Sequence, residues 1–148
     1  MRPGRLPAAV AVAVLLLATT SCGDKEAGYC KALSSDQKLF AEMDEDASGL
    51  GLLSHRSDLH RLADKAPDDL DDEWQTFLGA VDAFAATLHE LGVKPADFVD
   101  GKPPAGLSPS DRTRIANAAS ELSSQDVVVA ANGIEQQAKD VCKLQLGL

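Results

Sequence analysis

A broad apolar stripe between residues 70 and 91 constrains the fold of this chain more than any other feature. Its apolar side chains recur every three or four positions, which places them on one face of an α-helix. Pro67 and the carboxylates after it suit a first helical turn, and Gly92 suits the residue after a last turn. We therefore expect a long helix at the centre of the core. Its buried face should carry Leu70, Trp74, Phe77, Leu78, Val81, Phe84, Ala85, Leu88 and Leu91.

Similar spacing predicts four more helices along the chain. Two cover about residues 27–43 and 52–64, a third starts after a capping Ser108 or Ser110, and the last covers about 125–144. The third should turn inward Ile115, Ala118, Ala119 and Leu122, and the last Val128, Ala131, Ile134, Ala138 and Val141.

The local sequence of two segments fits more than one kind of structure. The run of valines at 127–129 favours a strand when taken alone, but the sequence contains no partner strand, so we expect a helix there. Gly133 weakens that helix by about 1 kcal/mol relative to alanine and indicates a close contact with another helix. The segment 93–107 is rich in glycine and proline, which predicts a long connection in which Phe98 and Val99 tuck against the bundle.

Size and composition favour one helical domain. The chain has 148 residues, of which 45% are apolar, and this suffices for a single core. Aromatic residues make up only 4%, and clusters of strand-favouring residues are rare. We expect an all-α fold, an up-down bundle of four to five helices.

The first 21 residues have the layout of an export signal. Arg2 and Arg5 precede an uncharged apolar run of the length that secretory signals use, too short for a stable membrane helix. Small residues then lead to Cys22 and Gly23. This arrangement resembles the lipobox of bacterial lipoproteins, with Thr19 where leucine is usual. The resemblance implies that the Cys22 sulfur carries a diacyl anchor and becomes the first residue after cleavage; simple secretion is the alternative.

Three cysteines in an exported chain leave one without a partner. Acylation of Cys22, implied by the lipobox, would explain it and would leave Cys30 and Cys142 to form a structural disulfide. A redox-active thiol or metal ligation is the alternative, but neither cysteine has a CxxC neighbour or clustered ligands. Such a disulfide would bring the start of the first helix to the end of the last.

The whole layout resembles the small lipoproteins of high-GC Gram-positive bacteria. The shared features are the lipobox, the Tyr29–Cys30 pair, the Ala/Asp-rich helical domain and Cys142 near the end. The resemblance implies a signal peptide at 1–21, an acylated anchor and short linker at 22–28 and a bundle at 29–148. The domain would lie on the outer face of the cell membrane, tethered by a linker that reaches roughly 20 Å when extended.

Charge limits the partners of this domain. Residues 22–148 contain 12 basic and 23 acidic residues, a net charge of −11 with histidine neutral. Such a surface repels nucleic acid and anionic lipid headgroups, so membrane contact should come through the anchor. A basic partner could dock on the acidic group at the start of the central helix, although helix-start electrostatics explains most of it. That group consists of Asp68, Asp69, Asp71, Asp72 and Glu73.

Three motifs each match part of a known functional site but lack residues that the site needs. The residues Asp44, Asp46, Ser48 and Gly49 match the first half of a calcium-binding EF-hand loop, but His55 stands where the closing glutamate is needed. An acidic turn is the simpler interpretation.

His55 and His60 are five residues apart, whereas helical zinc ligands lie four apart, and His89 is remote in sequence. Ser35 and Lys38 have the spacing of serine–lysine acyl transferases but lack the companion motifs. We therefore expect no metal, cofactor or catalytic residue.

These observations predict a non-catalytic binding or accessory module of the cell envelope. One alternative is a carrier that holds a small apolar ligand between the 70–91 helix and the last helix. The other is an enzyme of unknown type, which would need titratable side chains that converge in a cleft.

Overall fold

The computed structural model describes residues 21–46 and 50–148. This part of the chain is helical and contains no strand, only an isolated bridge between Val99 and Lys102. The all-α prediction is therefore confirmed. The elements are α1 (Ser21–Ser35), α2 (Gln37–Asp44), α3 (Gly51–Ser54), α4 (Arg56–Ala63), η1 (Asp68–Leu70), α5 (Asp71–Glu90), η2 (Pro95–Asp97), α6 (Pro109–Glu121) and α7 (Gln125–Asp140).

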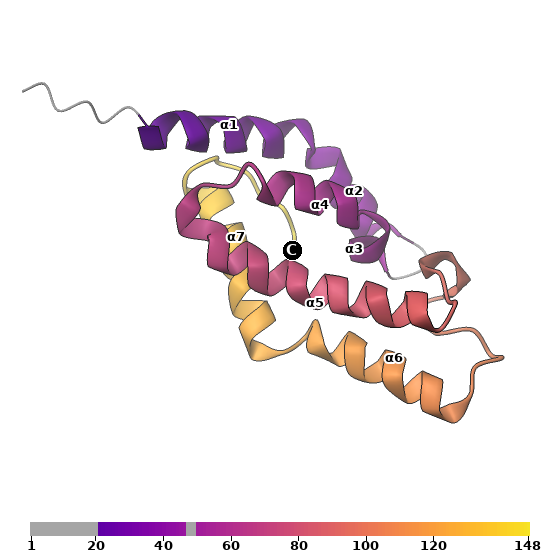
Figure 1. The fold of residues 1–148 in the computed structure, drawn as a ribbon. Coiled ribbons are helices and arrows are strands. Elements are labelled where there is room, and N and C mark those ends of the chain that lie inside the picture. The colour runs from indigo at the N-terminus through magenta and orange to yellow at the C-terminus, as the bar shows by residue number, and fades with distance from the viewer. Residues whose placement is uncertain (1–20, 47–49) are drawn as a thin grey trace, which may run out of the picture.

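Helix α5 is the centre of the core, as its apolar stripe predicts. It packs against α3, α4, α6 and α7, and α1 runs along the side of α4 that faces away from α5 (Figure 1). In that view α6 runs beside the C-terminal half of α5, whereas α7 crosses α5 near its N-terminal end. The largest fully buried side chains come from four of the helices and are Tyr29, Phe84, Leu33, Leu59, Leu62, Leu88, Ile134 and Val81.

The expected number of helices was wrong, because two expected helices are each broken in two. The 27–43 helix breaks at Asp36 and the 52–64 helix breaks at His55, where both residues leave helical geometry. Serine and aspartate at the first break compete with the helix for backbone hydrogen bonds, and the Ser35 hydroxyl donates to the Lys31 carbonyl. The described residues thus form seven α-helices in place of four or five.

The long connection after α5 matches the prediction except at Val99. Gly92 has a φ of +65°, the left-handed conformation that ends a helix, and Ser108 caps α6 by accepting a hydrogen bond from the Asp111 amide. Phe98 is buried as predicted. Val99 is instead 68% exposed, because it pairs with Lys102 in a tight turn that points it outward.

The buried face of α7 is shifted from the predicted one. Val127 and Ala130 face the core with Ile134 and Ala138, whereas Val128 is 46% exposed. The other corrections are Val141, which is 41% exposed, and Ala131, which is only partly buried. Three consecutive valines fit either face of a helix, so periodicity alone could not choose between them.

Gly133 lies on the face of α7 that packs against α5. A Cβ added at Gly133 would come within 2.9 Å of the Glu73 Cγ on α5. The close helix contact that this glycine predicted is therefore confirmed.

The predicted disulfide is present. Cys30 on α1 and Cys142 just after α7 are bonded, and their α-carbons are 5.0 Å apart. α7 ends at Asp140, earlier than the predicted residue 144, because Lys143 adopts a left-handed conformation with a φ of 61°. Residues 143–148, the closing segment, then turn back along the bundle (Figure 1).

The segment predicted as a linker is helical where the structure describes it. α1 begins at Ser21, so a helical rise of about 1.5 Å per residue replaces the extended reach expected for 22–28. The expected signal peptide, apart from its last residue, lies outside the described residues. Within 21–46 and 50–148, no helix has the length and apolar character needed to cross a bilayer.

Candidate functional site

A groove of about 420 Å³ lies between α4 and the first half of α5, with α1 at its edge. Ala63, Ala66, Trp74 and Leu78 contribute apolar surface to it, and polar side chains line the rest. Three of these are carboxylates, so we call it the acidic groove. The lining comprises Lys25, His60, Ala63, Asp64, Ala66, Asp71, Trp74, Gln75, Leu78, Gly79 and Asp82.

Asp82 links α4 to α5 at one end of the acidic groove. Its carboxylate contacts the His60 Nε2 at 2.9 Å and accepts a hydrogen bond from the Arg56 Nε at 2.6 Å. Burial alone would raise the pKa of Asp82, but His60 and Arg56 together outweigh that effect and lower the pKa below its ordinary value. Asp82 therefore stays ionised and is already paired on the protein.

Lys25 forms the edge contributed by α1. Its ammonium pairs with Asp68, which precedes α5. This hydrogen bond is the main reason that the pKa of Lys25 lies above its usual value; slight burial opposes it, and the charge of Asp71 adds to it. Asp64, in contrast, has no ion-pair partner among the residues that the structure describes. Asp64 and Asp71 are thus the carboxylates least committed to the fold.

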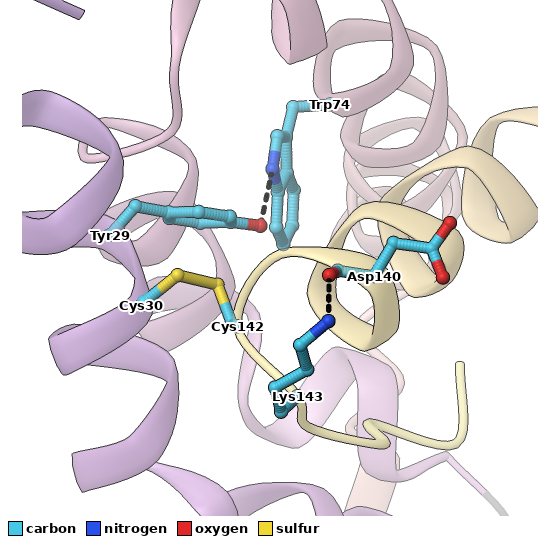
Figure 2. Close-up of a disulfide and its surroundings, with 6 residues drawn as sticks. All are labelled: Tyr29, Cys30, Trp74, Asp140, Cys142 and Lys143. Carbon is cyan, nitrogen blue, oxygen red and sulfur yellow. Dashed lines mark hydrogen bonds between the residues drawn. A yellow bond between two sulfur atoms is a disulfide. The ribbon is translucent and has the colours of Figure 1, made fainter. Parts of the chain in front are cut away.

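A buried aromatic pair, Tyr29 and Trp74, lies beneath the surface of the acidic groove. The Trp74 indole N–H donates to the Tyr29 hydroxyl at 3.2 Å, and Tyr29 precedes the disulfide residue Cys30 (Figure 2). Trp74 also meets the Phe77 ring edge-on. Burial raises the pKa of Tyr29 to about 12, although the bond from Trp74 acts in the opposite direction. The disulfide, Tyr29 and Trp74 together join α1, α5 and the end of α7.

The titration of Tyr29 should report this burial directly, because it is the single tyrosine of the chain. We expect tyrosinate absorbance to rise with a midpoint near pH 12 in the folded protein and about 10 in denaturant. Since the folded state holds the proton more tightly, the associated stability is complete below pH ~10 and is lost as the pH rises through ~12. The loss should be roughly 2 to 3 kcal/mol and should be absent in Tyr29→Phe. A folded-state midpoint near 10 would show that the hydroxyl is exposed.

The acidic group proposed from sequence is dispersed around the start of α5. Asp71 lines the acidic groove, and Asp68 is paired with Lys25 at its edge. Glu73 faces α7 beside Gly133, while Asp69 and Asp72 are exposed. The structure therefore brings one of the five predicted carboxylates into the groove and adds Asp64 and Asp82.

The other sequence motifs do not assemble into sites. Asp44 ends α2 and Asp46 accepts a hydrogen bond from Ser54, while Ser48 and Gly49 lie outside the described residues. His55 lies beside Asp58, His60 lies on Asp82, and His89 is exposed in the last turn of α5. Across residues 21–46 and 50–148, no three metal-ligating side chains are placed to hold an ion.

The serine–lysine spacing also has a structural explanation. The Ser35 hydroxyl donates to the Lys31 carbonyl at the end of α1, and Lys38 pairs with Glu42 one turn along α2. The Ser35 and Lys38 side chains therefore each have another partner and are not paired with each other.

The interface expected to hold an apolar ligand is closely packed. Ile134 and Ala138 of α7 are fully buried beside α5, and Glu73 lies against Gly133. An apolar-walled cavity lies instead beside α2 and α3.

Sequence reasoning missed the groove residues His60 on α4, Asp64 just after α4 and Asp82 near the middle of α5. His60 and Asp82 are 22 positions apart on different helices, and no motif connects them. A search of the chain against protein-family models, curated proteins and solved structures finds no match.

Proposed function

We propose that this protein is a lipid-anchored, extracytoplasmic binding module that captures a basic group of a cell-envelope partner in the acidic groove. The observation that carries the proposal is the arrangement of Asp64, Asp71 and Asp82 around apolar surface in one groove of about 420 Å³. The exposed parts of Ala63 and Gly79, above the buried Trp74 and Leu78 side chains, offer that surface to the aliphatic stem of a lysine or arginine. The carboxylates offer charge-assisted hydrogen bonds to its head.

Charge favours a cationic occupant. Residues 22–148 carry a net charge of −11, which attracts basic partners and speeds their association. Asp82 is already paired with Arg56 and His60, so Asp64 and Asp71 are the side chains that would contact the partner. We expect these two to determine affinity.

The groove lining supports binding over catalysis. It contains no serine, threonine or cysteine, so His60 has no hydroxyl or thiol nucleophile beside it in this part of the described structure. His60 and Asp82 are also 43% and 38% exposed at the side chain, in contrast to the desolvated setting that strengthens catalytic electrostatics. An enzyme remains the alternative, and hydrolysis that depends on His60 would favour it.

The membrane location rests on the lipobox at Cys22. We expect Cys22→Ser to release the full chain from membranes into the soluble fraction, while Cys142→Ser leaves it membrane-bound. Mass analysis of the membrane-bound protein should find the diacyl group on Cys22. An unmodified Cys22 in protein purified from membranes would contradict the proposed lipid anchor.

The groove is tested by binding of a short lysine-rich peptide to the purified protein. Trp74 is the single tryptophan and lines the groove, so its fluorescence reports binding. We expect Asp64→Asn with Asp71→Asn to weaken binding at least about tenfold, a loss of ~1.4 kcal/mol. The matched control is Asp100→Asn with Asp126→Asn, two exposed positions away from the groove. Equal weakening by both double variants would show non-specific attraction and would contradict the proposal.

A further inference from the structure

A second cavity, of about 210 Å³, lies between α2, α3 and α5. It shares no lining residue with the acidic groove. Apart from Asp44, its side-chain walls are apolar. The main walls are Phe40, Met43, Leu53, Phe77, Phe84 and Leu122. Such a cavity favours an apolar occupant, because apolar walls offer water no hydrogen-bond partners.

The closing segment covers part of this cavity. Gly147 and Leu148 line it, and Leu146 is 4% exposed. Figure 1 shows the segment, in yellow, running back from α7, and its last two residues line the cavity with residues of α2, α3 and α5. The cover is therefore a short stretch without regular structure, not a helix of the core.

One carboxylate holds the closing segment in place. Glu135 on α7 accepts hydrogen bonds from the Leu146 amide at 3.1 Å and from the Gly147 amide at 2.9 Å. At its other end the segment starts beside the disulfide, where Lys143 is held in a left-handed conformation. The segment thus has a fixed base, and its far end is latched mainly through Glu135 and the buried Leu146 side chain.

We propose that this cavity is a binding site for a single linear alkyl chain and that the closing segment is its lid. Apolar cavities of about 150 Å³ bind a ring the size of benzene, so 210 Å³ has room for a short chain. Displacing Leu148 from the cavity would lengthen the channel for that chain. Asp44 lines the same cavity, so the ligand's head group is neutral or cationic, not a carboxylate.

The lid and the ligand compete for the same space, so the strength of the hydrogen bonds from the lid to Glu135 should change the affinity for the ligand. Release of the Leu146 and Gly147 amides from Glu135 removes two bonds to a charged acceptor, and these are stronger than neutral ones. A ligand then displaces the lid at lower cost, and its apparent affinity rises. Glu135→Gln keeps an acceptor oxygen at the same place and should have a smaller effect.

The test is calorimetric titration of the purified protein with octanol, a neutral single-chain probe. We expect saturable binding to the wild type, about tenfold tighter binding to Glu135→Ala and less than about threefold change in Glu135→Gln. Leu122→Trp, which fills the cavity from its partly exposed rim, should abolish binding. Val128→Trp, on the exposed face of α7, is its control and should bind normally.

Two results would overturn the proposal. One is octanol binding that survives Leu122→Trp unchanged, which would place the ligand elsewhere. The other is an unchanged affinity in a Glu135→Ala protein whose circular dichroism shows a normal fold. If Glu135→Ala does not fold, Leu148→Gly replaces it, because this change removes the lid side chain from the cavity and should tighten binding in the same way. None of these outcomes depends on the acidic groove.

Discussion

Loss of the Cys30–Cys142 disulfide is expected to lower the free energy of unfolding by about 4 to 5 kcal/mol. The bond joins residues 112 positions apart, so it removes a large amount of conformational entropy from the unfolded chain. The effect should appear in denaturant unfolding of Cys142→Ser, or of the wild type under reducing conditions. The corresponding fall in melting temperature is roughly 12 to 20 °C.

Cys22→Ser is the matched control for this prediction. It removes a sulfur that the disulfide does not use, so the free energy of unfolding should stay within about 0.5 kcal/mol of the wild type. Cys30→Ser and Cys142→Ser should have similar effects, and the double variant should cost little more than either one. Equal destabilisation by the Cys22 and Cys142 variants would contradict the observed pairing.

Trp74→Ala should be the most damaging core substitution among the aromatic residues, with a loss of about 3 to 5 kcal/mol. Trp74 is 2% exposed, its ring centroid lies 6.1 Å from that of Phe77, and its N–H bonds to Tyr29. Truncation removes apolar burial, the ring contact and the hydrogen bond together, and leaves a void between α1 and α5. Chemical denaturation followed by circular dichroism measures the loss without relying on tryptophan fluorescence.

Two milder variants separate these contributions. Trp74→Phe keeps most of the ring, so it should cost less than Trp74→Ala. Tyr29→Phe keeps both rings but leaves the buried indole N–H without its acceptor, which costs about 1 to 3 kcal/mol. Val128→Ala on the exposed face of α7 should change stability by less than about 0.5 kcal/mol. A loss for Trp74→Ala as small as that of Val128→Ala would mean that the indole is not buried.

The parts of the fold that were predictable depend on long, regular patterns. The stripe of α5 spans more than five helical turns, so single exceptions do not obscure its period. Breaks at Asp36 and His55 were not predictable, because a helix that bends keeps its apolar spacing on either side of the bend. The face of α7 was not predictable either, since Val127 and Val128 are chemically identical and only packing against α5 separates them.

The acidic groove shows why sites are harder to predict than cores. Its polar side chains come from α1, α4 and α5, and each is unremarkable within its own helix. Asp71 was found because it lies in a dense acidic run, whereas Asp64 and Asp82 are isolated in sequence. Their convergence follows from how α4 packs on α5, which depends on contacts between residues distant in sequence.

The position of the disulfide also has a mechanical consequence. Tension applied between residue 22 and the end of the closing segment passes along α1 to Cys30 and crosses directly to Cys142. The chain between the two sulfurs carries no load, so only residues 22–29 and 143–148 can be drawn out, to a combined length of about 50 Å when fully extended. A protein pulled at one end from a membrane and at the other by a partner would therefore lengthen slightly while its helices stay packed.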